Sequence, residues 1–544
     1  MKKILLILGV LLMTISTLAE SVKVGDLYYE RNYTYNTASV TYQVWFSDEN
    51  YAGMKSIIIP AEIECNGTTY TVTSIGKGAF QSCESLTSII IPNSVTSIGE
   101  DAFWGCSSLE GIEFPNSITN IGEEAFCYCT SLKYIDFPSK LTTIGKEAFL
   151  MCYSLDSITI PKSVRNIEEK AFRQCGSLKS IKVEAGNPIY DSRDNCNAII
   201  KTSTNTLIAG CQNTVIPNSV RNIGDWAFNW CKSLTSIFIP KSVTTIGKGA
   251  FAGCVGLKYI KVELGNPIYD SRENSNAIIK TATNTLVVGC HNSTIHNSVT
   301  TISEGAFGHC TTLKSVIVPK SLKYIERGAF EGCDSLGVIK VEAGNTTFDS
   351  RENCNAIIDT YNNTLVLGCA GTTIPNSVTT IGEGAFYCCY SLKSISIPSS
   401  VNRINKEAFQ YCRNLTSITI PNSVKWIDEK AFSGCRGLVS LTLGTGVISI
   451  GERAFNSCSS LKSITIPNSV KWIEENAFAD CDALASITIG TGVKSIGWWA
   501  FCNYNHDIKI TYKGTTQQWR NVETNNIVCN NIIKLHCVDG DVYL

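Results

Sequence analysis

An Ala-Phe dipeptide recurs along this 544-residue chain at intervals of 23 residues. One copy of the repeat, residues 86–108, reads L-T-S-I-I-I-P-N-S-V-T-S-I-G-E-D-A-F-W-G-C-S-S. A segment of this length cannot bury its own apolar face, so neighbouring copies have to stack into one continuous core. The sequence therefore predicts a repeat solenoid. The fifteen phenylalanines of the dipeptide are Phe80, Phe103, Phe126, Phe149, Phe172, Phe228, Phe251, Phe307, Phe330, Phe386, Phe409, Phe432, Phe455, Phe478 and Phe501.

The spacing of apolar residues within one copy predicts its local structure. Each copy begins with Leu-x-x-Ile-x-Ile, and the alternation at its end is typical of a short, half-buried strand. The proline that follows, Pro92 in the copy above, ends the strand. Ile98-Gly99 predicts a turn, and the Ala-Phe-x-x-Cys segment has room for at most one or two helical turns. We expect a β-dominated solenoid with short helical turns.

Three intervals between successive phenylalanines are longer, each of 56 residues, and each holds a variant unit. The variant units lie near residues 183–216, 262–295 and 341–374, and matching phenylalanines in this region are 79 residues apart. In the first variant unit, residues 198–201 and 206–209 are predicted to form a hairpin that replaces the Ala-Phe turn. Fifteen regular and three variant units give about eighteen stacked turns.

The two ends of the chain differ from the repeat. Lys2 and Lys3, the apolar run 4–12 and Thr17-Leu18-Ala19 predict a secretory signal peptide over residues 1–19. No later stretch is apolar for long enough to span a bilayer, so we expect no transmembrane segment after signal cleavage. Residues 20–73 are predicted to be a β-rich cap, residues 74–512 the solenoid, and residues 513–544 a second cap, because an open stack would expose its core and strand edges.

Composition and motifs argue against several functions. Basic and acidic residues nearly balance, 46 against 47, and no basic block occurs, so we expect no nucleic-acid partner. The five histidines occupy no shared repeat position, and phosphate-binding, dinucleotide-binding and nucleophile motifs are absent. We expect no catalytic residues, no cofactor and no metal. A hidden hydrolase ranks last among the alternatives. The alternative for a metal is calcium at paired acids of the variant units, which more simply bond loop amides: Asp191/Asp194, Asp270/Glu273 and Asp349/Glu352.

The repeat L-x-x-I-x-I-P-x-S-V-x-x-I-G-x-x-A-F-x-x-C resembles the BspA-like class of bacterial leucine-rich repeat proteins. The resemblance covers about residues 74–512. It implies a leucine-rich-repeat type of solenoid and an exported protein, secreted or on the cell surface and outer membrane-associated. It also implies adhesion to host matrix proteins or to other bacteria.

Fourteen of the 25 cysteines lie three residues after a repeated phenylalanine, where a small thiol fills an interior corner. We expect a ladder of buried free thiols, with disulfides between neighbouring turns as the alternative. Cys196/Cys211 and Cys354/Cys369 are weaker candidate pairs, and Cys529–Cys537 is the best disulfide candidate. Representative ladder positions are Phe80, Cys83, Phe103, Cys106, Phe126, Cys129, Phe149, Cys152, Phe409, Cys412, Phe432 and Cys435.

Side chains between the core positions of the strands are expected to form a continuous outer surface on the concave solenoid face, where such proteins usually bind. Its C-terminal part is a row of Ser and Thr, whereas its middle part mixes lysines with aromatic residues. We expect this middle part to bind host matrix or cell-surface proteins. The alternatives are a glycan-binding module, or a structural envelope protein with a bacterial partner. The candidate ligand-binding residues are Tyr134, Asp136, Lys182, Phe238, Tyr259, Lys261 and Lys340.

Overall fold

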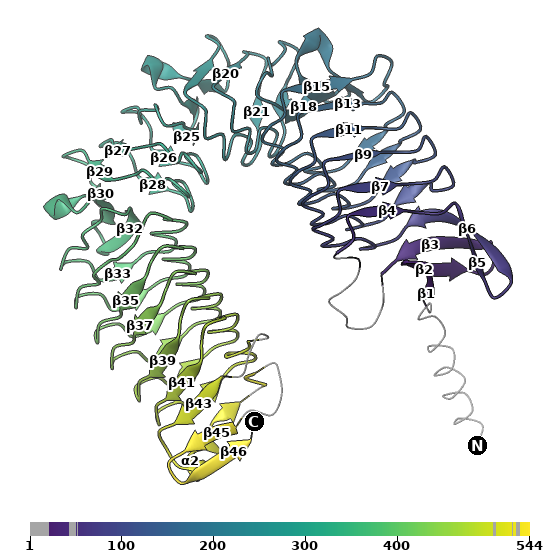
Figure 1. Ribbon diagram of the computed structural model, residues 1–544. Helices are drawn as coiled ribbons and strands as arrows, with labels where there is room; N and C mark the ends of the chain where they lie inside the picture. Colours follow the sequence, from purple (N-terminus) through teal and green to yellow (C-terminus); the bar gives the residue numbers. More distant parts are fainter. Residues whose placement is uncertain are drawn as a thin grey trace, which may run out of the picture. The chain divides into compact units, whose positions relative to one another are not determined.

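The computed structural model describes residues 21–42, 51, 53–503, 508–524, 526–528 and 534–543. The predicted signal peptide, residues 1–19, lies outside them. The chain divides into two compact units: unit 1 comprises the residues up to 257 with 263–266, and unit 2 comprises 258–262 with 267 onwards. Each unit is a stack of turns built from short strands (Figure 1). The predicted β-dominated solenoid is confirmed.

Each regular turn of unit 1 contributes two short strands, which we call the first and second strand. Register is kept from turn to turn, so that Ile135 lies opposite Ile112, and Ile121 opposite Ile98. The buried isoleucines thus form continuous rows. The first strands are β4 (Ser56–Ile58), β7 (Ser88–Ile90), β9 (Gly111–Glu113), β11 (Tyr134–Asp136), β13 (Ser157–Ile160), β15 (Ser180–Val183) and β20 (Ser236–Ile239). The second strands are β8 (Ser97–Ile98), β10 (Asn120–Ile121), β12 (Thr143–Ile144), β14 (Asn166–Ile167), β19 (Asn222–Ile223) and β21 (Thr245–Ile246).

Unit 2 has the same arrangement of first and second strands. Its first strands are β22 (Tyr259–Val262), β27 (Ser315–Val318), β29 (Val338–Val341), β35 (Ser417–Thr419), β37 (Ser440–Thr442), β39 (Ser463–Ile466), β41 (Ser486–Ile489) and β43 (Lys509–Tyr512). Its second strands are β26 (Thr301–Ile302), β28 (Tyr324–Ile325), β33 (Thr380–Ile381), β34 (Arg403–Ile404), β36 (Trp426–Ile427), β38 (Ser449–Ile450), β40 (Trp472–Ile473), β42 (Ser495–Ile496) and β44 (Glu523–Thr524).

The Ala-Phe segments are not helical, which corrects the predicted short helical turns. The backbone N–H of Phe103 donates to the carbonyl of Ala125 in the next turn, at 2.8 Å, whereas an α-helix would bond four residues back along the chain. The residue before the alanine also has a positive φ, 55° at Asp101, which an α-helix does not accept. The phenylalanine rings stack between turns, with 5.0 Å between the ring centroids of Phe103 and Phe126.

The three variant units replace the Ala-Phe turn with an antiparallel hairpin, as predicted. Leu365 and Gly368 lie on the second strand of the third hairpin, and a Cβ at Gly368 would collide with the ring of Phe386 in the following turn. Glycine is therefore required where the phenylalanine stack resumes. The hairpin strands are β17 (Ala198–Lys201) with β18 (Thr206–Gly210), β24 (Ile278–Lys280) with β25 (Thr285–Val288), and β31 (Ala356–Asp359) with β32 (Thr364–Gly368).

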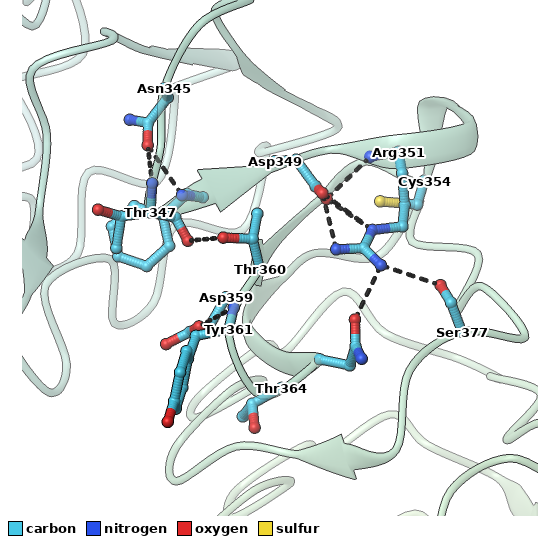
Figure 2. Close-up of polar contacts among 12 residues, drawn as sticks. Asn345, Thr347, Asp349, Arg351, Cys354, Asp359, Thr360, Tyr361, Thr364 and Ser377 are labelled. Atoms are coloured by element: carbon cyan, nitrogen blue, oxygen red, sulfur yellow. Dashed lines mark hydrogen bonds and ion pairs between the residues drawn. The ribbon is translucent and has the colours of Figure 1, made fainter.

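A short strand and a one-turn 3₁₀ helix precede each hairpin. In the third variant unit Arg351 holds this segment in place (Figure 2). Its guanidinium bonds both carboxylate oxygens of Asp349, and its Nη1 donates to Asn363 Oδ1 at 2.9 Å and to the Ser377 hydroxyl at 3.4 Å. The segments are β16 (Tyr190–Asp191) with η1 (Arg193–Asn195), β23 (Tyr269–Asp270) with η2 (Arg272–Asn274), and β30 (Phe348–Asp349) with η3 (Arg351–Asn353).

Both ends of the stack continue its sheets. The strand β4 precedes the first Ala-Phe copy, yet Ile57 pairs in register with Ile89. At the other end Leu535 pairs with Ile510. Within the described part of the chain, no helix has the length and hydropathy needed to cross a bilayer. The remaining elements are β1 (Val22–Val24), β2 (Leu27–Asn32), β3 (Thr37–Thr41), β5 (Glu62–Cys65), β6 (Thr68–Ile75), α2 (Thr516–Trp519), β45 (Lys534–Cys537) and β46 (Gly540–Tyr543).

Candidate protein-binding face

The first strands carry two outward positions each, because burial alternates along them. In β13 the side chains of Ser157 and Thr159 are exposed while Ile158 and Ile160 are buried. The outward residues of successive first strands lie side by side, as Thr159 and Lys182 do. Within each unit these outward residues form a surface, which we call the first-strand face of that unit.

In unit 1 the predicted binding residues lie on this face. Tyr134 and Asp136 occupy the two outward positions of β11, and Tyr134 is 59% exposed. Lys182 lies two strands further on, in β15, and makes no ion pair with any described residue. Phe238 follows the first hairpin along the chain, in β20, and is 48% exposed. Binding by these four residues stays a prediction.

In unit 2 the remaining predicted residues also point outward. Tyr259 and Lys261 are the two exposed residues of β22, and Tyr259 is 63% exposed. Lys340, on β29, lies in register with the exposed Ile317 of β27. Further along unit 2 the same row becomes threonine, with Thr465 opposite Thr488. The apolar and lysine-bearing part of the face therefore gives way to a uniformly hydroxylated part.

The prediction from sequence missed one element of the face. Ile58 and Ile90 lie opposite each other on β4 and β7, and both are exposed. Ile58 falls before the first Ala-Phe copy, in the segment assigned to the cap. A signal was available, since Ser56-Ile-Ile-Ile-Pro60 repeats Ser88-Ile-Ile-Ile-Pro92 without change.

The cysteine ladder is a set of free thiols with a polar role. All fourteen repeat-position cysteines are free in the structure. The Cys106 thiol donates to the carbonyl of Phe80 at 3.2 Å, and the Cys435 thiol donates to the carbonyl of Phe409 at the same distance. Burial raises the pKa of Cys435 to about 12, so the thiol stays protonated near neutral pH. Such thiols are poor nucleophiles.

The candidate disulfide pairs have different outcomes from the predicted cysteine ladder. Cys196, Cys211, Cys354 and Cys369 are free thiols, so the two weaker candidate pairs are not formed. Of the pair Cys529–Cys537, Cys529 lies outside the described residues, and Cys537 is a free thiol and takes no part in a bridge. Cys502, which the prediction did not single out, forms a disulfide.

The first acid of each pair proposed to bind calcium is paired with an arginine. Asp191 and Asp270 pair with Arg193 and Arg272, each with a closest nitrogen–oxygen distance of 2.7 Å. Asp349 pairs in the same way with Arg351. Across the described residues, no group of three or more His, Cys, Asp or Glu is placed to hold a metal ion. These acids brace the variant units.

One arrangement in unit 2 has the composition of a hydrolytic triad. His296 Nδ1 lies 2.8 Å from the Ser298 hydroxyl, and His296 Nε2 lies 3.0 Å from Glu273. However, the backbone N–H of Ser298 also donates to Nδ1, and Arg272 donates to the Ser298 hydroxyl at 2.8 Å. The same arginine–serine contact occurs in the third variant unit, which has no histidine there. The arrangement is therefore a variant of the contacts that Arg351 makes in the third variant unit, which we call the arginine brace.

Two cavities flank the first and third variant units at matching positions of the repeat. The one in unit 1, of about 310 Å³, contains Arg173, whose guanidinium lies 4.3 Å from the centre of the Trp226 ring. The one in unit 2, of about 240 Å³, contains Arg327 beside Tyr387. Each lies where a hairpin adjoins two regular turns. Acidic residues share both cavities, among them Glu168 and Glu331.

These stacked turns, with a buried Leu/Ile/Phe core, define a leucine-rich-repeat solenoid. The model of the BspA type leucine-rich repeat region matches residues 69–196, 204–277, 286–365, 368–456 and 402–523. The chain belongs to the BspA-type leucine-rich repeat family. A search of curated proteins found no match.

Solved structures of similar proteins come from several bacteria. A leucine-rich cell surface protein of Faecalibacterium prausnitzii is 23% identical, with 94% of this chain and 99% of that chain covered and a TM-score of 0.36. A leucine-rich repeat protein of Bacteroides ovatus is 24% identical, with 94% and 100% covered and a TM-score of 0.30. The pneumococcal vaccine antigen PcpA is 18% identical, with 95% and 100% covered and a TM-score of 0.26. At these TM-scores the likeness adds nothing to the family assignment.

Proposed function

We propose that this chain is an exported, surface-located binding protein that recognises other proteins through its first-strand face, without catalysis. The observation that carries the proposal is the presence of exposed apolar side chains on the first-strand face of each unit. Ile90 and Tyr134 are about 60% exposed in unit 1, as are Tyr259 and Ile317 in unit 2. Large apolar side chains gathered on one face are typical of protein-interaction surfaces.

The lysines on this face support the proposal. Lys182, Lys261 and Lys340 are exposed, and none of them forms an ion pair with a described residue. Elsewhere on the stack, lysines pair with acids one turn away, as Lys133 does with Glu110 at 2.9 Å. Lys261 shares its strand with the exposed Tyr259, and Lys340 lies opposite the exposed Ile317. Lysines beside exposed apolar side chains suit a partner with acidic and apolar groups. Host matrix proteins, host cell-surface proteins and other bacterial surface proteins all offer such groups.

Charge reversal of the three lysines tests the proposal. We would immobilise a panel of matrix proteins, host cells and bacterial surface proteins and measure binding of the chain without its predicted signal peptide. Lys182→Glu, Lys261→Glu and Lys340→Glu together should weaken binding at least tenfold. The matched control is Lys162→Glu, Lys241→Glu and Lys320→Glu, which reverses three exposed lysines at equivalent positions of the same cassettes, in the turns after the strands. Equal binding by both variants would remove the proposal.

A further inference from the structure

The second strands of unit 2 carry two exposed tryptophans in one row. Trp426 on β36 lies in register with Ser449 on β38, and Ser449 lies in register with Trp472 on β40. The two indoles are 42% and 45% exposed. The corresponding residues of neighbouring turns are Thr380, Arg403 and Ser495. Smaller or polar residues therefore occupy this strand position in the neighbouring turns, and the fold does not require tryptophan there.

The turn between the tryptophans is small at both outward positions. Its residues are Ser449 and, two positions later, Gly451. A Cβ at Gly451 would lie 2.7 Å from the carbonyl carbon of Asp428 in the preceding turn, so no side chain fits there. The small residues of this turn therefore leave a gap between the side chains of Trp426 and Trp472, with Ser449 and Gly451 at its base. We call it the tryptophan slot.

One wall of the slot is held in place from behind. Arg403 pairs in register with Trp426 from the strand on the side away from Ser449, and its guanidinium lies 5.7 Å from the centre of the Trp426 ring. Arg403 is itself fixed by two hydrogen bonds to Asp428, of 2.8 and 3.2 Å. A cation stacked on one face of the indole orients the ring across the stack. The other face of Trp426 is therefore turned along the row, toward Ser449 and Trp472.

The width of the slot follows from the turn spacing. In these three turns the rings of Phe432, Phe455 and Phe478 are 5.1 Å apart at each step. Trp426 and Trp472 are two steps apart, which gives a gap of about 10 Å between their rings. A flat aromatic guest held by two contacts of about 3.5 Å needs only about 7 Å. A pyranose ring carries hydrogens and hydroxyls on both faces, so it fills a gap of about 10 Å.

The polar groups at the slot suit a neutral sugar. Glu474 follows Trp472 by two positions, is exposed, and makes no ion pair with a described residue. Its carboxylate can accept hydrogen bonds from sugar hydroxyls, and the Ser449 hydroxyl can donate or accept. Asp428 lies at the matching position of the opposite wall, and its charge is already balanced by Arg403. An unbalanced carboxylate at the slot disfavours sulfated or uronic-acid sugars.

We propose that the tryptophan slot binds one pyranose ring of a neutral oligosaccharide, between the indole faces of Trp426 and Trp472. This site lies on the second strands and is separate from the first-strand face. Its ligand is a glycan, whereas the first-strand face takes a protein.

A filled slot tests the proposal without removing either tryptophan. Ser449→Phe places a ring between the two indoles, while Ser495→Phe makes the same change in the same row, outside the slot and on the far side of Trp472. We would titrate the full chain and both variants with neutral tetrasaccharides of glucose, mannose, galactose and N-acetylglucosamine, by calorimetry. We expect at least one of them to bind the unchanged chain and Ser495→Phe. We expect Ser449→Phe to bind that sugar at least tenfold more weakly.

Three results would overturn the proposal. The first is that the unchanged chain binds no neutral tetrasaccharide. The second is that Ser449→Phe binds as well as the unchanged chain does. The third is that sulfated tetrasaccharides or aromatic peptides, titrated in the same way, bind at the slot while neutral sugars do not. Trp472→Ala is a second variant, which removes a wall instead of filling the gap, and it should give the same loss.

Discussion

The cysteine that follows each repeated phenylalanine is a hydrogen-bond donor as well as a packing group. The sequence predicts its burial from the spacing, because a small side chain recurs at one interior position. The sequence does not predict the bond to the phenylalanine carbonyl 26 residues earlier, as from Cys435 to Phe409. That bond depends on how far each turn is offset against the next, and no local pattern reports this offset.

Substitution of one ladder cysteine tests this role. Cys435→Ala removes the thiol donor and leaves the Phe409 carbonyl with one hydrogen bond, from the backbone N–H of Cys412 at 3.1 Å. We expect the free energy of local opening to fall by about 1 kcal/mol. Cys435→Ser keeps a donor of nearly the same size, so it should cost less than Cys435→Ala. Hydrogen exchange of the amides in residues 409–458 measures both. Equal losses in the two variants would show that packing alone accounts for the cysteine.

The raised pKa of the buried thiols makes a prediction about alkaline stability. Burial raises the pKa of Cys175, Cys254 and Cys435 from 9.0 to about 12. The unfolded chain loses these protons above about pH 9 while the folded chain keeps them, so stability is complete below pH 9 and falls as the pH rises toward 12. The loss is about 1.4 kcal/mol per pH unit for each such thiol.

Unfolding by urea between pH 7 and pH 10.5 would show this loss. The midpoint should stay level up to about pH 8.5 and then fall steeply. Cys435→Ser should fall less steeply, because one titrating thiol is gone. A midpoint that stays level to pH 10.5 would contradict the assignment of buried, protonated thiols.

Among the elements, the variant unit is the one in which the sequence did not determine the role of the acidic residues. Its hairpin is predictable from two apolar runs around a polar turn. The role of its acids is not, because aspartates near an asparagine fit a cation site as well as an arginine brace. The choice depends on Arg351 reaching Asn363 and Ser377, residues 12 and 26 positions away, which are brought together only by the stack (Figure 2).

Removal of the brace should loosen the third variant unit. Arg351→Ala deprives Asp349 of its charge partner and releases Asn363 and Ser377, and we expect a loss of about 1–2 kcal/mol in local stability. Arg351→Lys keeps the charge but cannot reach three partners at once, so it should recover only part of the loss. Arg436→Ala, at an exposed arginine of unit 2, is the control. If hydrogen exchange in residues 348–377 is the same in Arg351→Ala and the control, the brace does not stabilise the unit.

For the whole molecule, the repeat determines the fold and leaves the choice of partner to exposed residues. The fifteen Ala-Phe copies made the solenoid predictable, and the outward rows followed from strand alternation. The candidate binding sites were harder to predict. Ile58 on the first-strand face precedes the first copy, and the tryptophans of the separate tryptophan slot look like ordinary β-formers. The charges also nearly cancel, so the overall field does not select a partner and local patches have to.

The most direct test of protein binding through the first-strand face is to map the positions at which a captured protein contacts the chain. A photo-reactive phenylalanine analogue would be placed singly at Tyr134, Tyr259, Thr442 and Thr488, which are outward residues of first strands. The chain would then be cross-linked to whichever protein of the panel it binds. We expect cross-links from position 134 or 259 and few from the threonine positions. Cross-links that come equally from Thr442 and Thr488, or from none of the four, would contradict this expectation.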